Sequence, residues 1–372
     1  MKLIPSLGVL AVLLAGLTLG SCTHETVNGA TALERVEPGK QALLDGEWPY
    51  WAGDIQSTRY SPLTDIASGN VDRLEIVWRW SADTTGSSAS ANFKSTPLMV
   101  GGVLYMPWLD HGAAAIDAGT GKTLWTFLPD IRDIGGRAAS LAPRSLAYWT
   151  DGQASRLYHN SVDGRLFAID ARTGEADRAF GDKGSVDLRT NLTEGRAVKD
   201  VGSVSPALVV GDVVIVQVIP GGARNRESTP GDVRGYDVRS GRLLWTFHTV
   251  PQKGEFGYDT WRDNAADHVG GVGVWSMMSA DPETGYVYLP TETPSNDFYG
   301  GHRLGDGLYG ESLVCIDSRT GKRVWHFQTV HHGVWDYDNP TAPILHDIVH
   351  DGKRRKVVTL LTKQSLVLFS TA

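Results

Sequence analysis

The densest group of chemically capable side chains lies between Val324 and Asp338, where the sequence reads VWHFQTVHHGVWDYD. It combines two carboxylates, Asp336 and Asp338, with the adjacent histidines His331 and His332. Carboxylates can exchange protons or bind hard metal ions, and histidines can bind zinc. A zinc pair is not expected, because adjacent residues on a strand point to opposite faces. We expect one of the two histidines to be a packed or hydrogen-bonded structural residue.

The elements that must position this stretch follow a repeat. The pattern Asp-x-x-x-Gly-x-x-x-Trp-x-Phe starts at Asp117, Asp237 and Asp317, and a degenerate copy starts at Asp170 with Arg178 in place of the Trp. In each copy an alternating strand ends at the Asp, a tight Asp–Gly turn follows, and the next strand carries the Trp. No helical periodicity of comparable length competes with this pattern. The repeat predicts an all-β fold, a β-propeller built of four-stranded antiparallel blades.

The spacing of the repeats predicts how many blades the chain holds. The four Asp residues stand at 117, 170, 237 and 317, so successive copies are 53, 67 and 80 residues apart. A minimal blade takes about 40–50 residues, so these blades carry long loops. We expect four or five blades, with the functional residues on the loops, because loops longer than about 12–15 residues are usually functional.

Several stretches together resemble the pyrroloquinoline-quinone (PQQ)-dependent dehydrogenases, in particular the membrane-linked glucose-dehydrogenase type. The resemblance runs from Trp48 to Gln364. It is carried by GDIQSTRYSPL (53–63), APRSLAYW (142–149), residues 231–247, GEFGYDTW (254–261), YGGHR (299–303) and the VWHFQTVHHGVWDYD stretch. The family implies an eight-bladed propeller and, as its cofactor, a flat tricyclic quinone bearing three carboxylates.

The resemblance also implies roles for individual residues. Trp275 matches the indole on which the cofactor stacks, and Arg144 matches a residue facing its charged edge. Asp336 matches the general base that takes the alcohol proton as hydride passes to the quinone. His332 and His248 are candidates to line the pocket. Plainer alternatives remain for the other residues: Trp275 as a core Trp, Arg144 as a surface Arg, and the two histidines as structural residues.

The metal ligands are implied less directly. Glu227 precedes Val233-Arg-Gly-Tyr236 as a metal-binding Glu does in related alcohol dehydrogenases, although the spacing is longer here. Asp338 stands where some relatives add a further acid. Hard carboxylate oxygens suit calcium or magnesium. The family's next ligand is often an Asn before a Pro, whereas this chain reads Thr291-Glu-Thr-Pro294. Glu227 as a solvated loop acid remains the alternative.

Composition and the amino terminus set the remaining expectations. The 372 residues include 35 Lys+Arg and 42 Asp+Glu with no basic run, which gives no footprint for nucleic acid. Two cysteines cannot build a disulfide framework or a cysteine zinc site. Residues 1–21 predict a lipoprotein signal peptide, because an apolar run leads through small residues to Cys22 and resembles a bacterial lipobox.

Lipidation of Cys22 would tether an exported chain on the periplasmic side, at the outer membrane or the cell surface. An ordinary cleaved signal peptide or one transmembrane helix is the alternative. We expect residues 22–47 to be a linker and residues 48–372 to be the propeller, with Cys315 packed in a strand.

After Gln364 the sequence departs from the family, whose members continue well beyond this point. The resemblance therefore implies four or five of eight blades, without the family's later Lys and Asp active-site positions. We expect such a chain alone to be poorly stable or inactive, because an incomplete ring leaves an open edge.

The leading functional hypothesis is a quinoprotein dehydrogenase, or a truncated copy, that oxidises an aldose sugar or alcohol. It would use PQQ with calcium or magnesium and pass electrons to membrane quinone or a cytochrome. One alternative is a non-enzymatic outer-membrane lipoprotein propeller that serves as a protein-binding scaffold. Another is a degenerate half that binds quinone without turnover. The long loops, Trp275 and the HHGVWDYD stretch favour the dehydrogenase.

Overall fold

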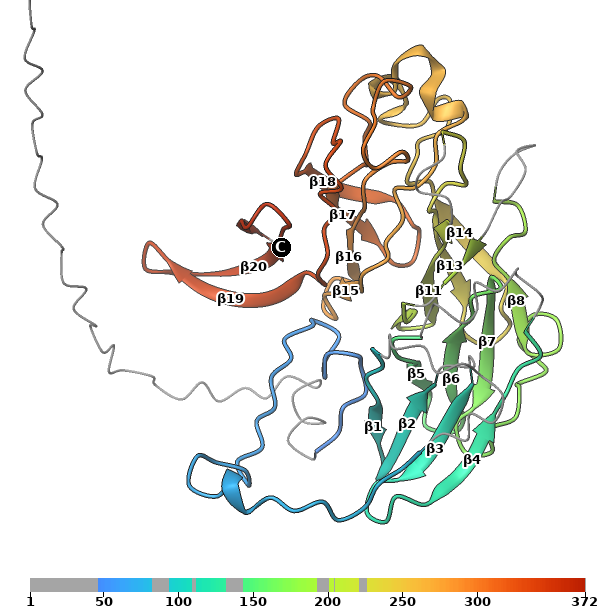
Figure 1. Cartoon of the computed structure of the whole chain (residues 1–372), viewed down its shortest axis with the longest axis vertical. Helices are drawn as coiled ribbons and strands as arrows, with labels where there is room; N and C mark the ends of the chain where they lie inside the picture. The colour runs from blue at the N-terminus through green and yellow to red at the C-terminus, as the bar shows by residue number, and fades with distance from the viewer. Residues whose placement is uncertain are drawn as a thin grey trace, which may run out of the picture. The chain divides into compact units, whose positions relative to one another are not determined.

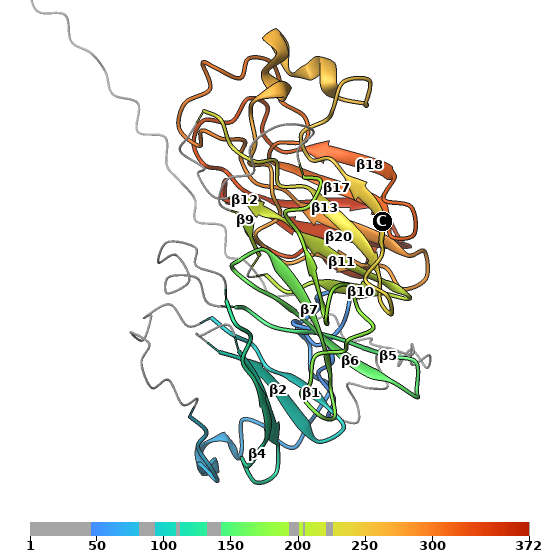
Figure 2. The ribbon, with the colours of Figure 1, turned by 90° about the vertical axis from the view of Figure 1, so that its right-hand side faces the viewer.

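The strands form in antiparallel pairs joined by short turns, as the repeat predicts (Figures 1 and 2). The computed structural model describes residues 46–81, 94–108, 112–131, 143–192, 201–203, 205–220 and 226–371. Within these ranges, four four-stranded sheets and one three-stranded sheet follow one another along the chain. The sheets comprise β1 (Leu98–Val100), β2 (Val103–Pro107), β3 (Ala113–Asp117) and β4 (Thr123–Phe127); β5 (Ala147–Thr150), β6 (Ser155–Asn160), β7 (Arg165–Asp170) and β8 (Ser185–Asp187); β10 (Leu208–Val210), β11 (Val213–Gln217), β13 (Val233–Asp237) and β14 (Leu243–Phe247); β15 (Ser279–Ala280), β16 (Tyr286–Pro290), β17 (Ser312–Asp317) and β18 (Arg323–Gln328); and β19 (Ile344–His350), β20 (Lys353–Leu361) and β21 (Val367–Thr371).

Shorter elements lie in the connections. They are the two-stranded pair β9 (Val201–Gly202) and β12 (Ile219–Pro220), and the 3-10 turns η1 (Val71–Arg73), η3 (Tyr258–Thr260) and η4 (Arg262–Asp267). The prediction of an all-β propeller with four or five blades is confirmed: four blades are complete in the described residues, and β19–β21 supply three strands of a fifth.

Each repeat Asp closes its own turn. The Oδ1 atom of Asp117 accepts the backbone N–H of Thr120 at 2.8 Å, and Gly121 follows with φ of +71°. Asp237 holds the N–H of Ser240 in the same way at 2.7 Å. A left-handed φ is free of steric cost only for glycine, which explains why the repeat places a Gly four residues after the Asp.

An indole fastens two of the four junctions between consecutive blades in the described part of the chain. Trp245 on β14 donates its Nε1–H to the backbone oxygen of Ser318 in the next blade at 2.9 Å. Its ring lies so close to Gly321 that a Cβ there would stand 2.5 Å from a ring atom. The same arrangement joins Trp78 to Gly121 and Trp125 to Gly174. After the second blade, where Arg178 replaces the Trp, the backbone N–H of Gly181 donates to Ser240 at 2.9 Å.

The hydrophobic core is divided among the interfaces between consecutive blades. One cluster joins the first blade to the second and contains Leu98 and Leu157. The largest joins the third and fourth blades around Trp245 and also encloses Trp261 from the long connection after β14. A further cluster packs Cys315 of β17 against the last three strands. Each blade therefore depends on its neighbours to bury its faces.

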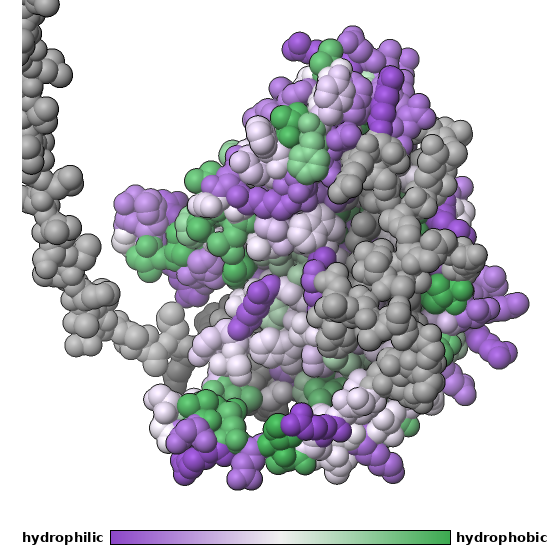
Figure 3. All heavy atoms as spheres, in the orientation of Figure 1, coloured by the Kyte–Doolittle hydropathy of each residue, from purple (hydrophilic) through white to green (hydrophobic). Residues whose placement is uncertain are grey.

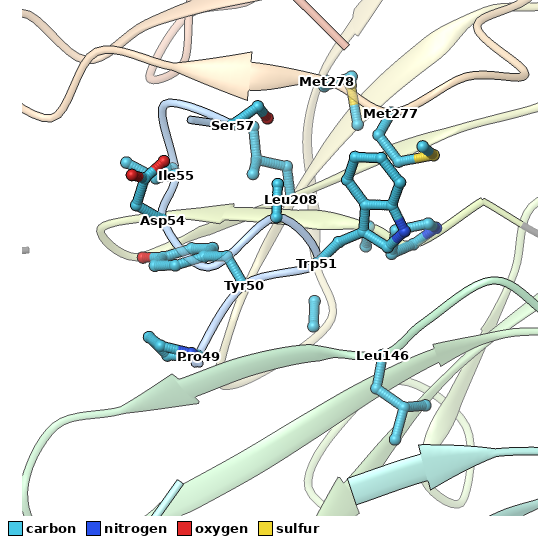
Figure 4. Close-up of a pocket in the computed structure, with 14 residues that line it drawn as sticks. Pro49, Tyr50, Trp51, Asp54, Ile55, Ser57, Leu146, Leu208, Met277 and Met278 are labelled. Carbon is cyan, nitrogen blue, oxygen red and sulfur yellow. The ribbon is translucent and has the colours of Figure 1, made fainter. Parts of the chain in front are cut away.

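A segment from residue 48 to residue 58 crosses the inner strands of several blades. Trp48 pairs with Met99 of β1 by two backbone hydrogen bonds of 2.8 and 3.0 Å. Farther along, the carbonyl oxygens of Ile55 and Gln56 accept N–H groups from β15 and β19 at 2.9 and 3.0 Å. Figure 4 shows side chains of this segment beside residues of the second, third and fourth blades, around a cavity of about 20 Å³.

Exposed large apolar side chains include a run between residues 60 and 77 and several on β19–β21; others lie elsewhere, among them Phe256, Phe298, Tyr299 and Trp335. Green surface in Figure 3 falls where Figure 1 draws these two regions. In the described part of the chain, no helix has the length and apolar character needed to cross a membrane.

Candidate functional site

The loops that lead into inner strands bring four of the implied site residues together. Arg144 lies three residues before β5 and Trp275 four residues before β15, while Asp336 and Asp338 lie on the loop between β18 and β19. Inner strands of neighbouring blades run in the same direction, so the loops before them meet at one end of the propeller. The turn between β20 and β21 reaches the same end and adds Lys363.

Arg144 packs on Trp275 across 131 residues of sequence. Its Nη1 atom donates to the backbone oxygen of Trp275 at 2.7 Å, and the guanidinium carbon lies 5.2 Å from the centre of the indole ring. Ser205, from the third blade, donates its hydroxyl to the same carbonyl. Burial lowers the pKa of Arg144, which nevertheless stays cationic because it starts from 12.5. Three blades thus fix the position of one indole.

The indole is also held at its edge by a buried carboxylate. Trp275 donates its Nε1–H to Oδ2 of Asp338 at 2.9 Å, and the backbone N–H of Thr293 donates to Oδ1 at 2.7 Å. Lys363 donates to the same Oδ2 at 3.1 Å, and its Nζ lies 5.9 Å from the centre of the Trp275 ring. The indole therefore has two cations within 6 Å of its centre, a distance at which cation–π attraction operates.

Lys363 also binds the second acid of the loop. Its Nζ donates to the backbone oxygen of Asp336 at 2.8 Å and lies 3.3 Å from Oδ2 of the same residue. Burial and the nearby charge of Asp338 raise the pKa of Asp336, while Lys363 opposes that rise. Asp336 has a left-handed φ of +54°, which is uncommon outside glycine and is typical of functional loops.

Two further carboxylates add negative charge beside this pair. Burial, with a smaller contribution from Asp338, raises the pKa of Glu292 to about 8. Burial, followed by the charges of Asp336 and Asp338, raises the pKa of Asp297 to about 6. Glu292 accepts the backbone N–H of Gly273 at 2.9 Å. The site therefore holds more carboxylate than its cations neutralise, so near neutral pH it retains a proton or binds a cation.

The two implied metal ligands lie in different surroundings. Glu227 is exposed, whereas Asp338 is buried and already accepts three hydrogen bonds. At the position of the absent Asn, Thr293 donates its hydroxyl to Glu311 at 2.8 Å. Carboxylate oxygens are suitable donors for calcium or magnesium. Among the described residues, however, no three Asp, Glu, His or Cys side chains gather closely enough to hold a metal ion.

The implied histidines bind protein groups outside the Trp275 cluster. Nδ1 of His332 lies 2.9 Å from the backbone oxygen of Gly305. His248 contacts Glu255 at 2.8 Å and Gln252 at 3.1 Å. Although burial alone would lower the pKa of His248, Glu255 and buried Asp232 raise it. Both rings have the contacts of structural histidines, and their pocket-lining role stays a prediction.

Sequence reasoning missed Lys363, Glu292 and Asp297. Lys363 lies inside the resembling region, but the family's later lysine was expected beyond the chain, so it received no role. The structure places this lysine against both site carboxylates. The other two acids lie on the connection after β16, and only their tertiary contacts single them out. Cys22 lies outside the described residues.

Residues 48–369 match the family model described as "PQQ: Glucose/ethanol/alcohol dehydrogenase, beta-propeller domain". The chain belongs to this family. It is 30% identical to the quinate/shikimate dehydrogenase (quinone) of Acinetobacter baylyi, over 91% of this chain and 44% of that protein. It is 28% identical to the quinoprotein glucose dehydrogenase of Escherichia coli, over 95% of this chain and 47% of that protein.

The solved quinohemoprotein alcohol dehydrogenase from Comamonas testosteroni matches with a TM-score of 0.72 and 27% identity, over 87% of this chain and 47% of that one. The chain spans about half the length of the curated relatives it matches. These relatives confirm the resemblance to the quinoprotein dehydrogenases. They do not favour the scaffold alternative.

Proposed function

We propose that this chain binds PQQ on the indole of Trp275 and contributes to the oxidation of a sugar or alcohol hydroxyl. One observation carries the proposal: the indole faces two cations, Arg144 at 5.2 Å and Lys363 at 5.9 Å, beside the paired acids Asp336 and Asp338. An aromatic floor flanked by cations suits a flat ligand with several carboxylates. When bound, the quinone supplies the acceptor for the two electrons of the substrate.

Of the two acids, Asp336 is better suited to accept the proton of the substrate hydroxyl. Its side chain is 38% exposed, whereas that of Asp338 is 11% exposed. Asp338 is already occupied by the N–H groups of Trp275 and Thr293. Burial and the nearby charge of Asp338 raise the pKa of Asp336, which makes its carboxylate a stronger base. Lys363 holds that carboxylate in place and stabilises its charge.

The substrate, the metal and the electron acceptor are proposed more broadly. The relatives named above act on glucose or on quinate and shikimate, so we propose a polyhydroxylated ring or a simple alcohol as the substrate. Calcium or magnesium is proposed on the family resemblance alone, because no three acidic, His or Cys side chains of the described residues gather closely enough to hold the ion, and no chemical step is assigned to a metal. By analogy with the named quinone acceptor of the Acinetobacter enzyme, we propose membrane quinone, or a cytochrome, as the acceptor.

We also propose that the chain is exported and anchored through Cys22, on the strength of the lipobox-like sequence before it. Incorporation of labelled fatty acid in a bacterial host tests this directly. The substitution Cys22→Ser should abolish the label, whereas Cys315→Ser should retain it. Label in the Cys22→Ser chain would contradict the anchoring proposal.

The quinone proposal is tested by adding PQQ to the full chain, with and without calcium or magnesium. Tryptophan fluorescence and dye-linked oxidation of glucose, quinate and ethanol are followed together. We expect saturable quenching that Trp275→Ala weakens by roughly 5- to 150-fold in affinity, since stacking on an indole contributes roughly 1–3 kcal/mol. Trp80→Phe removes an indole that packs against the first blade from the preceding segment and should leave the affinity unchanged. A folded chain that shows no quenching would contradict the proposal.

A further inference from the structure

Glu311, immediately before β17, is a buried carboxylate that the proposed chemistry does not use. The residue is 1% exposed. Its Oε1 atom accepts the hydroxyl of Thr293 at 2.8 Å, while Oε2 has no hydrogen-bond partner in the described part of the chain. Its backbone takes a left-handed φ of +45°. A buried charge in a costly backbone conformation is retained only where surrounding contacts determine it.

The carboxylate of Glu311 stands in space left by a glycine on the site loop. A Cβ built on Gly333 would lie 1.7 Å from Oε2 and 2.3 Å from the carboxyl carbon, so only a residue without a side chain fits there. Gly333 lies three residues before Asp336. Its backbone oxygen accepts Nη2 of buried Arg303. The start of the loop is also tied to Glu311, whose backbone oxygen accepts the N–H of Thr329 at 2.8 Å.

Two short routes connect Glu311 to the indole floor. Thr293, whose hydroxyl binds Glu311, gives its backbone N–H to Asp338 at 2.7 Å. Asp338 in turn accepts the Nε1–H of Trp275 at 2.9 Å. Through Gly333 and Thr329, Glu311 also contacts the loop that carries Asp338. The carboxylate therefore supports Asp338 from both sides without reaching the indole itself.

We propose that Glu311 is a positioning residue of the quinone site. By occupying the space beside Gly333 and binding Thr293, it fixes the loop 329–339 so that Asp338 holds the indole of Trp275 in place. This inference rests on the proposed function, since the indole matters as the floor for the quinone. If the proposal holds, a carboxylate at this place is needed to fix the loop, whichever residue supplies it.

This dependence on location gives a specific test, in which the carboxylate is supplied from residue 333 instead of residue 311. Glu311→Ser removes it. Gly333→Asp combined with Glu311→Ser returns a carboxylate to the same space from the other chain segment, because the added Cβ falls 1.7 Å from the present Oε2. The φ of Gly333 lies outside the left-handed range, so the backbone accepts an aspartate. Glu283→Ser, which removes an exposed acid paired with Lys356, is the matched control.

Two measurements on the full chain read the result: hydrogen–deuterium exchange of residues 331–339 without quinone, and PQQ affinity from fluorescence quenching. We expect Glu311→Ser to speed exchange in this segment and to weaken affinity roughly tenfold, as expected when a buried charged hydrogen bond is lost. The double variant should recover both to within about twofold. Glu283→Ser should change neither.

The proposal is overturned if Glu311→Ser leaves both readouts unchanged, or if the double variant is no better than the single one. Should Glu311→Ser fail to fold, Thr293→Val replaces it in both measurements, because it removes the hydroxyl that binds Glu311 and keeps the backbone N–H that binds Asp338; it should change both readouts in the same direction. If the parent chain binds no PQQ, the proposed function fails on its own. Exchange of residues 331–339 then still decides whether the carboxylate positions the loop.

Discussion

The junction between the third and fourth blades can be tested by adding a single methyl group. Gly321→Ala places a Cβ 2.5, 2.6 and 2.9 Å from three ring atoms of Trp245. The ring cannot easily retreat, because it is 8% exposed and its Nε1–H is fixed on Ser318 at 2.9 Å. Either the indole or the turn must move, and the core cluster around Trp245 must move with it.

Two costs add at this position. An alanine at φ of +68° loses about 1–2 kcal/mol of conformational energy. Overpacking of a buried ring typically costs a further 1–3 kcal/mol or so. We therefore expect Gly321→Ala to lower the free energy of unfolding by about 2–5 kcal/mol, a large part of the roughly 5–15 kcal/mol of a typical domain.

Gly352 provides a control that separates the two costs. It has nearly the same φ, +69°, but nothing lies within 4 Å of the Cβ that Gly352→Ala would add. This variant should lose only the conformational part, about 1–2 kcal/mol. Urea unfolding of both variants, followed by far-UV circular dichroism, measures the difference. Equal losses in the two variants would refute the indole packing on which the blade junctions rest.

Three further expectations concern the site. Lys363→Met removes the ammonium that lowers the pKa of Asp336, so this pKa should rise and PQQ affinity should fall roughly tenfold; a pH profile of quenching that does not move would contradict this. Trp275→Phe keeps an aromatic ring but removes the indole N–H from Asp338, which retains its bonds to Thr293 and Lys363, and should cost about 1.5–3 kcal/mol in urea unfolding; an unchanged midpoint would count against the bond. Glu292 has a folded pKa of about 8 against an ordinary 4.5, so its ionisation disfavours the folded state increasingly between these pH values. Glu292→Gln should therefore stabilise the chain progressively over that window, as read from unfolding midpoints, and a gain that is the same at both ends would be inconsistent.

The blades could be predicted from the sequence because each repeat defines its own turn and outer strand. An Asp, a Gly four residues later and a Trp four beyond that form the turn and carry the indole, which then packs on the Gly of the next copy. The fifth sheet lacks a copy of this pattern, so its three strands could be inferred only from the count of blades. The crossing of residues 48–58 over several inner strands has no local signature either, since it depends on backbone hydrogen bonds to residues far along the chain.

The candidate site was likewise predictable only in part from the sequence. Trp275, Arg144 and Asp336 could be named because a resemblance fixes residue types at recognisable positions. The contacts between these residues could not be predicted, because Arg144 and Trp275 are 131 residues apart and belong to different blades. Lys363 and Glu292 escaped notice because an isolated Lys or Glu has no pattern of its own. Only the folded chain shows that their charges face the same pair of carboxylates.

The geometry makes the chemistry of the site depend on the blade junctions. The backbone oxygen of Trp275 binds Arg144 from the second blade and Ser205 from the third, while the indole itself precedes the first strand of the fourth. A shift between the third and fourth blades must therefore stretch these bonds before any site residue is altered. Gly321→Ala acts on that junction and Gly352→Ala on a distant hairpin. If the junction fixes the position of the Trp275 indole, Gly321→Ala should weaken PQQ quenching even where the chain remains folded. Gly352→Ala should leave the quenching intact.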